Sequence, residues 1–279
     1  MSTFHLAARL HVILARKGDV AVVFRRGPSK QVATLLWNRK TDEITLGQWF
    51  KGTIYELRSD LSPNGKYMIY FAAKRAIGVN PETWTAISIT PYLKALALYP
   101  NGLTYCGGGL FIGEDTYWLQ HRIKIEVTTL CDTNLVHRDH GFKATDEYGG
   151  GDLGVYFPRL LRDGWKILDT KGNSRPEFYE FERAAGKYWK LRKRIHASSD
   201  SLRGKGFYWA EHELIKGGEH GQTVVSFPDW EWADMDRNRL VWCENGQLKT
   251  GTLLDDGLYD SVVIYDFNDM RFQAIKAPY

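Results

Sequence analysis

The spacing of apolar residues is the feature that most limits the folds open to this chain. Short runs rich in Val, Ile, Tyr, Phe and Trp alternate with clusters of Gly, Pro, Asn and Asp. This is the pattern of β-strands joined by tight turns. Helical spacing extends over only two brief stretches, 159–163 and 181–185, where we expect a single turn. The sequence therefore predicts an all-β protein.

Strands are expected wherever an apolar or alternating run lies between turn residues. The chain of 279 residues, 43% of them hydrophobic, can bury a full core, so we expect one domain over residues 1–279. Its ten Trp are spread along the sequence, which suits several small, similar cores. The expected strands are 10–15, 20–24, 32–37, 67–72, 84–89, 95–98, 117–121, 123–128, 165–168, 178–181, 188–191, 207–211, 224–227, 240–243, 247–253 and 262–265.

The net charge leaves the kind of binding partner open, whereas the cysteine content indicates the cellular compartment. The formal net charge of +4 is a mild basic bias that neither requires nor excludes an anionic partner. Cys106, Cys131 and Cys243 are odd in number and far apart, which is typical of free thiols in a reducing compartment, and we expect a cytoplasmic protein. No run of 18 apolar residues and no secretory leader is found, so we expect neither a membrane span nor export.

Turn signals recur at intervals that indicate repeated units. Two Pro-Asn-Gly turns begin 37 residues apart, at Pro63 and Pro100. Similar turn-then-strand junctions lie at 17–18, 163–164 and 236–238, and a weaker one at Gly206. These junctions predict about five small sheets, or six, each covering its neighbour's apolar face. We expect the strands at 10–15 and 262–265 to join the two ends.

One segment carries a family resemblance. Residues Ser59 to Phe71 read SDLSPNGKYMIYF and resemble the D-x-S-P-D/N-G-K-x-apolar blade signature of TolB-type and WD-repeat propellers. In such a turn, an Asp or Ser side chain caps the turn, and Pro63 fixes its own φ angle. Asn64 and Gly65 supply the positions with positive φ.

The remaining copies of this signature are poorer. Asp229 to Asp236, followed by 239–242, looks like a degenerate copy, and Pro100 to Gly102 looks like a third. The chain departs from the WD form because it has neither the Gly-His pair nor the Trp-Asp dipeptide. The resemblance implies a small β-propeller of about five, or six, four-stranded blades. Loops on one face of such a disc bind a protein, a peptide or a small ligand.

The densest group of potential catalytic residues lies in the middle of the chain, between predicted strands. His137, Asp139 and His140 are followed by Asp146 and Glu147. The His-x-Asp-His spacing matches no familiar zinc pattern, which favours a solvated polar loop over a metal or catalytic site. We predict no metal and no cofactor.

A second candidate is a basic, aromatic segment that could bind a partner or nucleic acid. Basic side chains beside aromatic rings can follow a phosphate backbone and stack on bases. Strand alternation separates Arg192 and Arg194 from Lys193, however, and edge strands often carry Lys and Arg, which favours a solvated edge. The candidate binding residues are Lys187, Tyr188, Trp189, Lys190, Arg192, Arg194, Arg203 and Lys205.

Two shorter motifs are better explained by structure. Alternation places His212 opposite Glu211 and Glu213, so the three cannot hold one ion. The glycines at 107–109 are not followed by Gly-Lys-Ser/Thr, which favours close backbone contact over a phosphate loop.

Three functions follow from these observations. We expect a noncatalytic protein-interaction or ligand-binding propeller module, an accessory subunit of an intracellular complex with a protein partner. The first alternative is a small-propeller hydrolase of glycosides or phosphoesters that uses Asp139, Asp146 and Glu147 as acid, base or ligand. The second alternative is nucleic-acid binding through residues 187–205.

Overall fold

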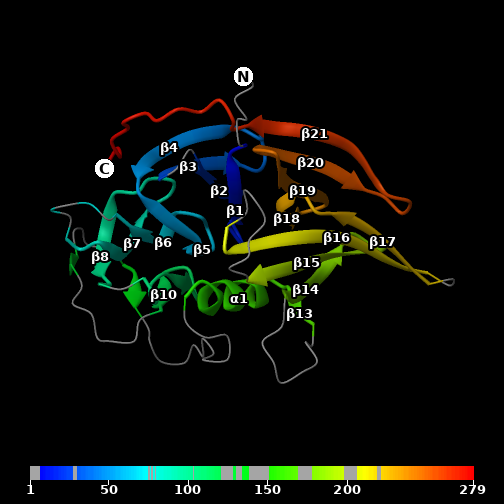
Figure 1. The fold of residues 1–279 in the computed structure, drawn as a ribbon, viewed down its shortest axis with the longest axis horizontal. Coiled ribbons are helices and arrows are strands. Elements are labelled where there is room, and N and C mark those ends of the chain that lie inside the picture. The colour runs from blue at the N-terminus through cyan, green and yellow to red at the C-terminus, as the bar shows by residue number, and fades with distance from the viewer. Residues whose placement is uncertain are drawn as a thin grey trace. The chain divides into compact units, whose positions relative to one another are not determined.

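A computed structural model places most of the residues that it describes in β-strands, with one helix among them (Figure 1). The residues that it describes are 7–27, 30–74, 76, 78, 80–102, 104–120, 128–129, 134–137, 151–168, 178–197, 206–218 and 221–279. Their strands form five sheets of three, four or five strands, nearly all antiparallel. The prediction of an all-β chain with about five successive sheets is confirmed.

The contacts divide the chain into two compact units, and the prediction of one domain stays a prediction. The first unit holds residues 1–11 and 164–270, and the second holds residues 12–163 and 271–279. Strand β1 crosses from one unit to the other between His11 and Val12.

Three sheets contain the strands that precede residue 163. The first has the order β1-β2-β3-β4, the second β11-β8-β7-β6-β5 and the third β12-β10-β9, where β12 pairs with β10 in parallel. Their bounds are β1 Arg9–Leu14, β2 Val20–Arg26, β3 Gln31–Asn38, β4 Ile44–Lys51, β5 Thr53–Leu61, β6 Tyr67–Ala73, β7 Thr83–Ile89, β8 Ala95–Pro100, β9 Gly109–Phe111, β10 Thr116–Leu119, β11 Thr128–Thr129 and β12 Val136–His137.

Two sheets follow residue 164. One has the order β13-β14-β15-β16-β17, and the other β18-β19-β20-β21. Their bounds are β13 Lys166–Ile167, β14 Phe178–Ala185, β15 Trp189–Ala197, β16 Tyr208–Gly218, β17 Gly221–Phe227, β18 Trp230–Asp236, β19 Arg239–Glu244, β20 Gln247–Leu253 and β21 Leu258–Asp266.

The cores of the sheets are apolar and rich in aromatic rings. In the second unit, one cluster gathers Phe24, Ile54 and Met68, and another gathers Ile69, Ile87 and Phe111. In the first unit, Trp230 stacks on Phe227 with ring centroids 3.8 Å apart and on Trp242 at 4.8 Å. Each cluster is small, because a thin sheet offers only a few inward positions.

The Pro63-Asn64-Gly65 turn joins β5 to β6 as a tight hairpin. The Ser62 hydroxyl accepts a hydrogen bond from the Tyr67 backbone N–H (2.9 Å) and donates one to Asn64 Oδ1 (2.8 Å). Gly65 has φ 78°, whereas Asn64 is not among the residues with positive φ. The prediction that both Asn64 and Gly65 adopt positive φ is therefore wrong for Asn64.

The Asp of the same signature serves a different purpose from the predicted turn cap. Asp60 Oδ2 accepts a hydrogen bond from the Phe111 backbone N–H (2.7 Å). Its carboxylate also forms a bidentate pair with Arg162, with distances of 2.5 and 2.9 Å. Arg162 lies in helix α1 (Leu153–Arg162), so this buried pair attaches the helix to β5.

Helix α1 corrects one sequence prediction, and β14 corrects another. Residues 159–163 were expected to form a brief turn, but they end a ten-residue helix in which residues 153–160 are buried. Residues 181–185 were also expected to turn, yet they continue β14 as an extended strand. In both cases long-range packing decided the local conformation, because short periodic stretches carry little propensity of their own.

The two chain ends do not meet in one sheet, contrary to our prediction. Strand β1 lies in the sheet with β2, and β21 lies in the sheet with β20. Instead, near the N-terminus, the Ala8 N–H donates to Asn268 Oδ1 and the Leu10 N–H donates to Glu231 Oε2, both at 2.9 Å. Side chains therefore hold the N-terminal segment within the first unit.

The segment 271–279 packs on the second unit. Gln48 Nε2 donates to the Ile275 carbonyl (2.7 Å), and the Tyr279 hydroxyl donates to the Lys94 carbonyl (2.5 Å). The ring of Phe272 lies 6.0 Å from that of Trp49, measured between centroids. This segment thus lies along β4.

Gly65 provides a test of the β5–β6 turn. A Cβ at this position would overlap Val20 Cγ2 and lie 3.1 Å from Ala15 Cβ. Gly102 has a similar φ of 67°, but nothing lies within 4 Å of its would-be Cβ. We expect Gly102→Ala to lower the free energy of unfolding by about 1 kcal/mol, through backbone strain alone. Gly65→Ala should lower the free energy of unfolding by roughly 1–3 kcal/mol more than Gly102→Ala does, because its Cβ also overpacks the turn.

Urea unfolding of the two alanine variants, followed by tryptophan fluorescence, compares these losses. Equal losses for Gly65→Ala and Gly102→Ala would show that the β5–β6 turn is not packed against β2 as described.

Candidate interaction face on the sheet of β14 to β17

The sheet of β14 to β17 has two faces of opposite character. Successive residues of a strand point to opposite sides, and the register places Phe181, Lys193 and His212 in one row across β14, β15 and β16. All three are buried, with exposures of 0%, 1% and 1%. The Lys193 ammonium lies 4.4 Å from the centroid of the Trp165 ring, and His212 Nδ1 lies 2.8 Å from the Trp230 carbonyl oxygen.

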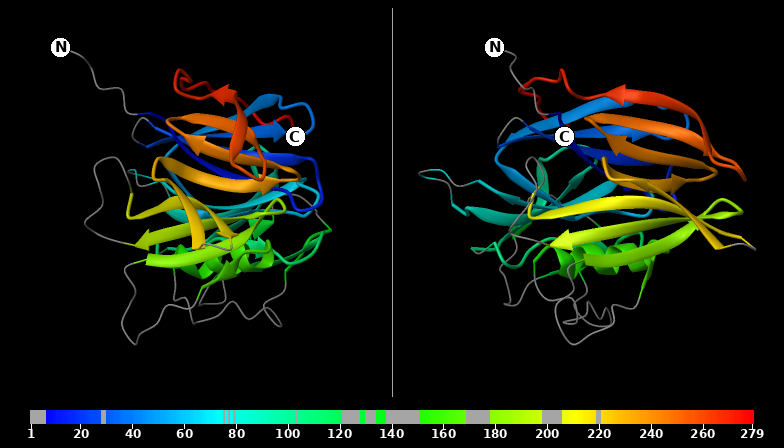
Figure 2. Two further views of the ribbon diagram at one scale, coloured as in Figure 1. Left: turned by 90° about the vertical axis from the view of Figure 1, so that its right-hand side faces the viewer. Right: turned by 45° about the vertical axis from the view of Figure 1, so that its right-hand side comes forward.

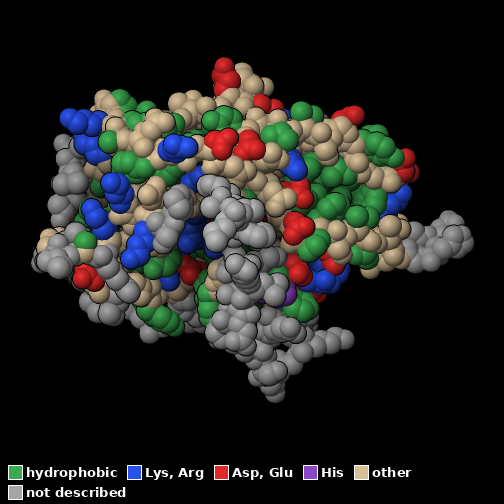
Figure 3. All heavy atoms as spheres, turned by 45° about the horizontal axis from the view of Figure 1, so that its top comes forward, with side chains coloured by type: hydrophobic (Ala, Val, Ile, Leu, Met, Phe, Trp, Pro, Cys, Tyr) green, Lys and Arg blue, Asp and Glu red, His purple; other side chains and the backbone are tan. Residues whose placement is uncertain are grey.

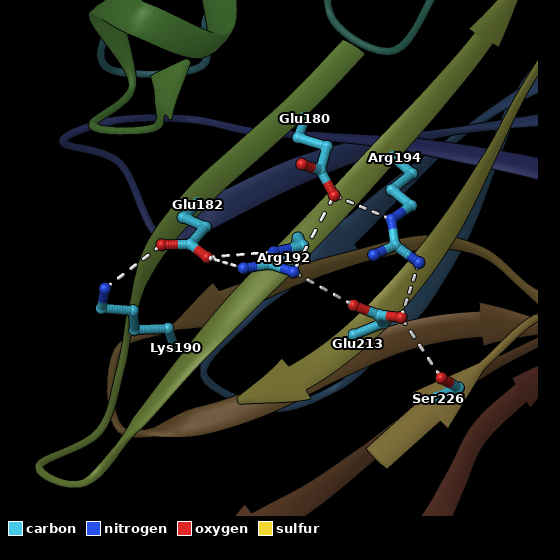
Figure 4. Close-up of polar contacts among 7 residues, drawn as sticks. All are labelled: Glu180, Glu182, Lys190, Arg192, Arg194, Glu213 and Ser226. Atoms are coloured by element: carbon cyan, nitrogen blue, oxygen red, sulfur yellow. Dashed lines mark hydrogen bonds and ion pairs between the residues drawn. The ribbon is translucent and has the colours of Figure 1, made fainter. Parts of the chain in front are cut away.

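The opposite face carries a row of alternating charges. Glu182, Arg192, Glu213 and Ser226 face one another across β14, β15, β16 and β17. Arg192 donates to Glu182 Oε1 from Nη2 (2.6 Å) and from Nε (3.0 Å), and its Nη1 lies 3.6 Å from Glu213 Oε2. Ser226 Oγ donates to Glu213 Oε1 at 3.3 Å. Figure 4 shows Arg192 lying between the two carboxylates.

A second row repeats this arrangement one step along the strands. Glu180, Arg194 and Glu211 oppose one another on β14, β15 and β16. Arg194 donates from Nε to Glu180 Oε1 (2.8 Å) and from Nη1 to Glu213 Oε1 (2.7 Å), which links the two rows. Lys190 donates to Glu182 Oε2 at 3.2 Å. We call Glu180, Glu182, Lys190, Arg192, Arg194, Glu211 and Glu213 the charged ladder.

The ladder keeps Glu182 and Arg194 ionised. Burial by itself would raise the pKa of Glu182, but hydrogen bonds from Arg192 and Lys190, together with their charges, outweigh burial and lower that pKa below its ordinary value. Burial would likewise lower the pKa of Arg194, but the hydrogen bond to Glu180 and the charges of Glu213, Glu180 and Glu211 raise it. Both groups therefore carry full charge at neutral pH.

An aromatic row lies at one end of the ladder. Phe178, His196 and Trp209 face one another on β14, β15 and β16. The His196 and Trp209 rings stack with centroids 3.7 Å apart and an angle of 4° between their planes. Phe178 lies 5.5 Å from His196, and the Arg194 guanidinium lies 5.5 Å from the Phe178 centroid. Charged and aromatic side chains thus form one continuous face.

The structure separates the residues predicted to bind. Lys190, Arg192 and Arg194 lie on the ladder, whereas Trp189 points to the opposite face and donates from Nε1 to the Leu254 carbonyl (2.7 Å). Lys187 and Tyr188 lie in the turn between β14 and β15, with the ammonium 4.9 Å from the ring centroid. Arg203 and Lys205 lie outside the described residues.

The expectation of a solvated edge strand is wrong for β15, because β15 pairs with β14 on one side and with β16 on the other. Three cations, Lys190, Arg192 and Arg194, face four carboxylates, Glu180, Glu182, Glu211 and Glu213, so the ladder has a formal charge of 3 − 4 = −1 with His196 neutral. Part of the segment 187–205 lies outside the described residues, and the nucleic-acid alternative stays a prediction.

The predicted catalytic cluster is only partly described. His137 lies on β12 rather than in a loop, and its ring stacks on Tyr117 with centroids 5.3 Å apart. Asp139, His140, Asp146 and Glu147 lie outside the described residues. The hydrolase alternative therefore stays a prediction.

Other predicted motifs have structural explanations. The carbonyl of Arg58 and the carbonyl of Trp118 lie so close to Gly108 and Gly109 that a Cβ on either glycine would overlap them, which confirms close backbone contact. Cys106 and Cys243 are free thiols. Burial raises the pKa of Cys243 well above its ordinary value, so this thiol is a poor nucleophile.

The sequence-based predictions did not include most residues of the charged ladder and the aromatic row, although the sequence contains one signal of the ladder. A hairpin centred near Gly186 brings Glu180 opposite Arg194 and Glu182 opposite Arg192, so oppositely charged residues recur at mirrored positions around the turn. That symmetry could have identified the ladder. The aromatic row could not be found in this way, because Trp209 follows a segment, 198–205, that separates it from β15 in the sequence.

Neither a metal cluster nor a membrane helix is found in the part of the chain that the structure describes. No three or more His, Cys, Asp or Glu of those residues are grouped so that they could hold a metal ion. The helix within those residues is too short and too polar to cross a bilayer.

Comparison with known proteins finds solved structures that align with most of this chain at low similarity. No family model matches the chain, and no curated protein matches it. Hydrazine synthase from Kuenenia stuttgartiensis aligns over 90% of this chain and 78% of its own, with 9% identity and a TM-score of 0.29. The tricorn protease aligns over 92% of this chain and 26% of its own, with 12% identity and a TM-score of 0.25.

The lowered pKa of Glu182 predicts a pH dependence of stability. A carboxyl whose pKa is lower in the folded state contributes stability above its ordinary pKa, and that contribution disappears as the pH falls through the folded value. The ordinary value is 4.5, so the loss should occur below about pH 4.5. We expect Glu182→Gln to lower the melting temperature at pH 7 and to lower it less at pH about 3.

Thermal unfolding at the two pH values, with Glu244→Gln on β19 as the control, measures this effect. An equal decrease in the melting temperature of Glu182→Gln at both pH values would contradict ionic stabilisation by the ladder.

Proposed function

We propose that the protein is a noncatalytic protein-interaction module that binds a partner through the charged ladder and the aromatic row. The observation that carries the proposal is the stack of His196 on Trp209 beside arginines held between carboxylates. Trp and Arg are the residues most often found at the energetic centres of protein interfaces.

The face offers pre-ordered side chains. Arg192 contacts three carboxylates and Arg194 contacts two, so their rotamers are restricted before any partner arrives, and less side-chain entropy is lost on binding. The ladder is also accessible at its margins, since the Lys190, Arg194 and Glu211 side chains are 62%, 28% and 31% exposed. The formal charge of −1 on the ladder favours a partner with a basic patch.

A more specific form of this proposal is that the protein is a member of the TolB-type and WD-repeat propellers. Its support is the β5–β6 hairpin, where Asp60, Ser62 and Gly65 of the blade signature make defined contacts. A hairpin also joins β18 to β19 around Arg237, which has φ 57°, at the predicted degenerate copy. Such modules present partners with a rigid surface.

The ladder itself is poorly suited to hydrolysis. A general acid must hold a proton near neutral pH, which requires a raised carboxyl pKa. Arg192 and Lys190 have the opposite effect, because they lower the pKa of Glu182. This favours binding over acid–base catalysis at this face.

Trp209 supplies the test of the proposed face. We expect Trp209→Ala to weaken binding of a co-purifying partner by more than about 2 kcal/mol, the range of interface hot spots. Tyr259→Ala on β21, where Tyr259 is 43% exposed, should leave binding unchanged.

The partner is first recovered from the native host with a tagged full-length chain and identified by mass spectrometry. Titration calorimetry with the purified partner then compares the two variants, after circular dichroism confirms that each is folded. Equal affinity of wild type and Trp209→Ala, or equal losses for Trp209→Ala and Tyr259→Ala, would rule out this face.

A further inference from the structure

Among the described edge strands of six or more residues, all but one are protected. An edge strand exposes unpaired N–H and C=O groups, and proteins cover, shorten, bend or charge such edges to prevent unwanted pairing. In the second unit β1 is buried, β4 is covered by the segment 271–279, and the carbonyls of Glu56 and Ser59 on β5 accept hydrogen bonds from Arg159 of α1. In the first unit β18 and β21 contain register shifts.

Strand β17 has none of these protections. It pairs with β16 over seven consecutive positions without a register shift, from His212–Phe227 to Gly218–Gly221. It is the last strand of its sheet, and Figure 2 shows it in the long hairpin with β16. Residues 222–226 are exposed, and Val224 and Val225, which point to opposite faces, are 46% and 40% exposed.

Strand β21 shows what a protected edge looks like in the same unit. It also exposes valines, with Val262 at 58% and Val263 at 46%, but its pairing with β20 shifts twice. Asp260 adopts φ 51° within it, and its sequence includes two Asp. Figure 3 shows hydrophobic side chains gathered at the right, where Figure 1 labels β17 and β21. Of these two strands, only β17 can template a regular ladder.

We propose that β17 pairs antiparallel with β17 of a second copy of this chain, which makes one continuous sheet across a two-fold axis. A two-fold interface must be complementary to itself, since every contact occurs twice. Strand β17 meets this requirement because its sequence, GQTVVSF, contains no charge and no proline. Two copies of β21 would instead bring their aspartates together.

The full overlap of the seven residues fixes the register. It places Val224 opposite Val224 of the second copy, and Thr223 opposite Val225. The axis stands perpendicular to the sheet, so the charged ladders of both copies lie on the same face. Pairs of β-branched side chains at opposed positions stabilise antiparallel sheets, and edge-to-edge strand addition is an established mode of association.

Electrostatics does not oppose this pairing. Glu213 lies on β16, one strand in from the junction, so the two copies of Glu213 are separated by three strand spacings across the sheet, about 14 Å, and are further displaced along the strands. That separation exceeds the Debye length of about 8 Å at physiological ionic strength, which screens the repulsion. Ser226, the residue of β17 beside Glu213, is small and neutral.

Sedimentation velocity of the full chain at increasing concentration tests the proposal. Wild type should show a reversible monomer–dimer equilibrium. Val224→Lys places two ammonium groups across the axis, and we expect it to weaken the dimer at least about tenfold. Val263→Lys makes the same change on β21 and should leave the dimer intact, as should the neutral variant Val224→Thr. Thermal unfolding shows whether Val224→Lys is folded.

Cysteine cross-linking tests the register independently. Directly opposed residues in an antiparallel pair fall within disulfide reach, so Val224→Cys should form a covalent dimer on oxidation, and Val225→Cys should do so far less. The dimer does not depend on the partner-binding face, so Trp209→Ala should still dimerise.

Two outcomes would overturn the proposal. One is a monomer at every concentration, and a loss of co-purified partner on Val224→Lys would then identify a foreign strand as the occupant of the edge. The other is a dimer that Val224→Lys does not weaken, because β17 would then lie outside its interface.

Discussion

Side-chain alternation along β14, β15 and β16 is the constraint on which the candidate site depends. Each strand must bury one face against the core of the unit, and the period of two sends every second residue to the other face. Phe181, Lys193 and His212 enter the core, so Glu182, Arg192 and Glu213 must lie together on the opposite face of the sheet. A register shift of one residue would place the whole ladder in the apolar interior.

The buried Lys193 shows how strongly this constraint acts. A lysine is almost never fully buried without compensation, yet its neighbours Arg192 and Arg194 occupy the ladder and leave it no other side. The Trp165 ring 4.4 Å away supplies a cation–π contact. The ladder and this contact are therefore two consequences of a single register.

Ion pairs serve different purposes in the two units. In the second unit the Arg162–Asp60 pair is buried and attaches α1 to β5, where removing one partner would leave an uncompensated charge. In the first unit the ladder is partly exposed, and each arginine contacts at least two carboxylates. Such a network contributes modestly to stability, and it orders a surface that a partner could recognise.

The sequence by itself determined the all-β class, most strand positions and the β5–β6 turn, because these depend on alternation and turn chemistry within a few residues. Ser62, Pro63 and Gly65 specify their hairpin locally. Tertiary structure alone decided the rest. Helix α1 ends in residues that carry only a weak local signal and is held by Asp60, about 100 positions earlier. His196 meets Trp209 only after β15 and β16 pair. The exposure of β17 likewise depends on which strands find partners, and pairing between distant segments is not encoded in local pattern.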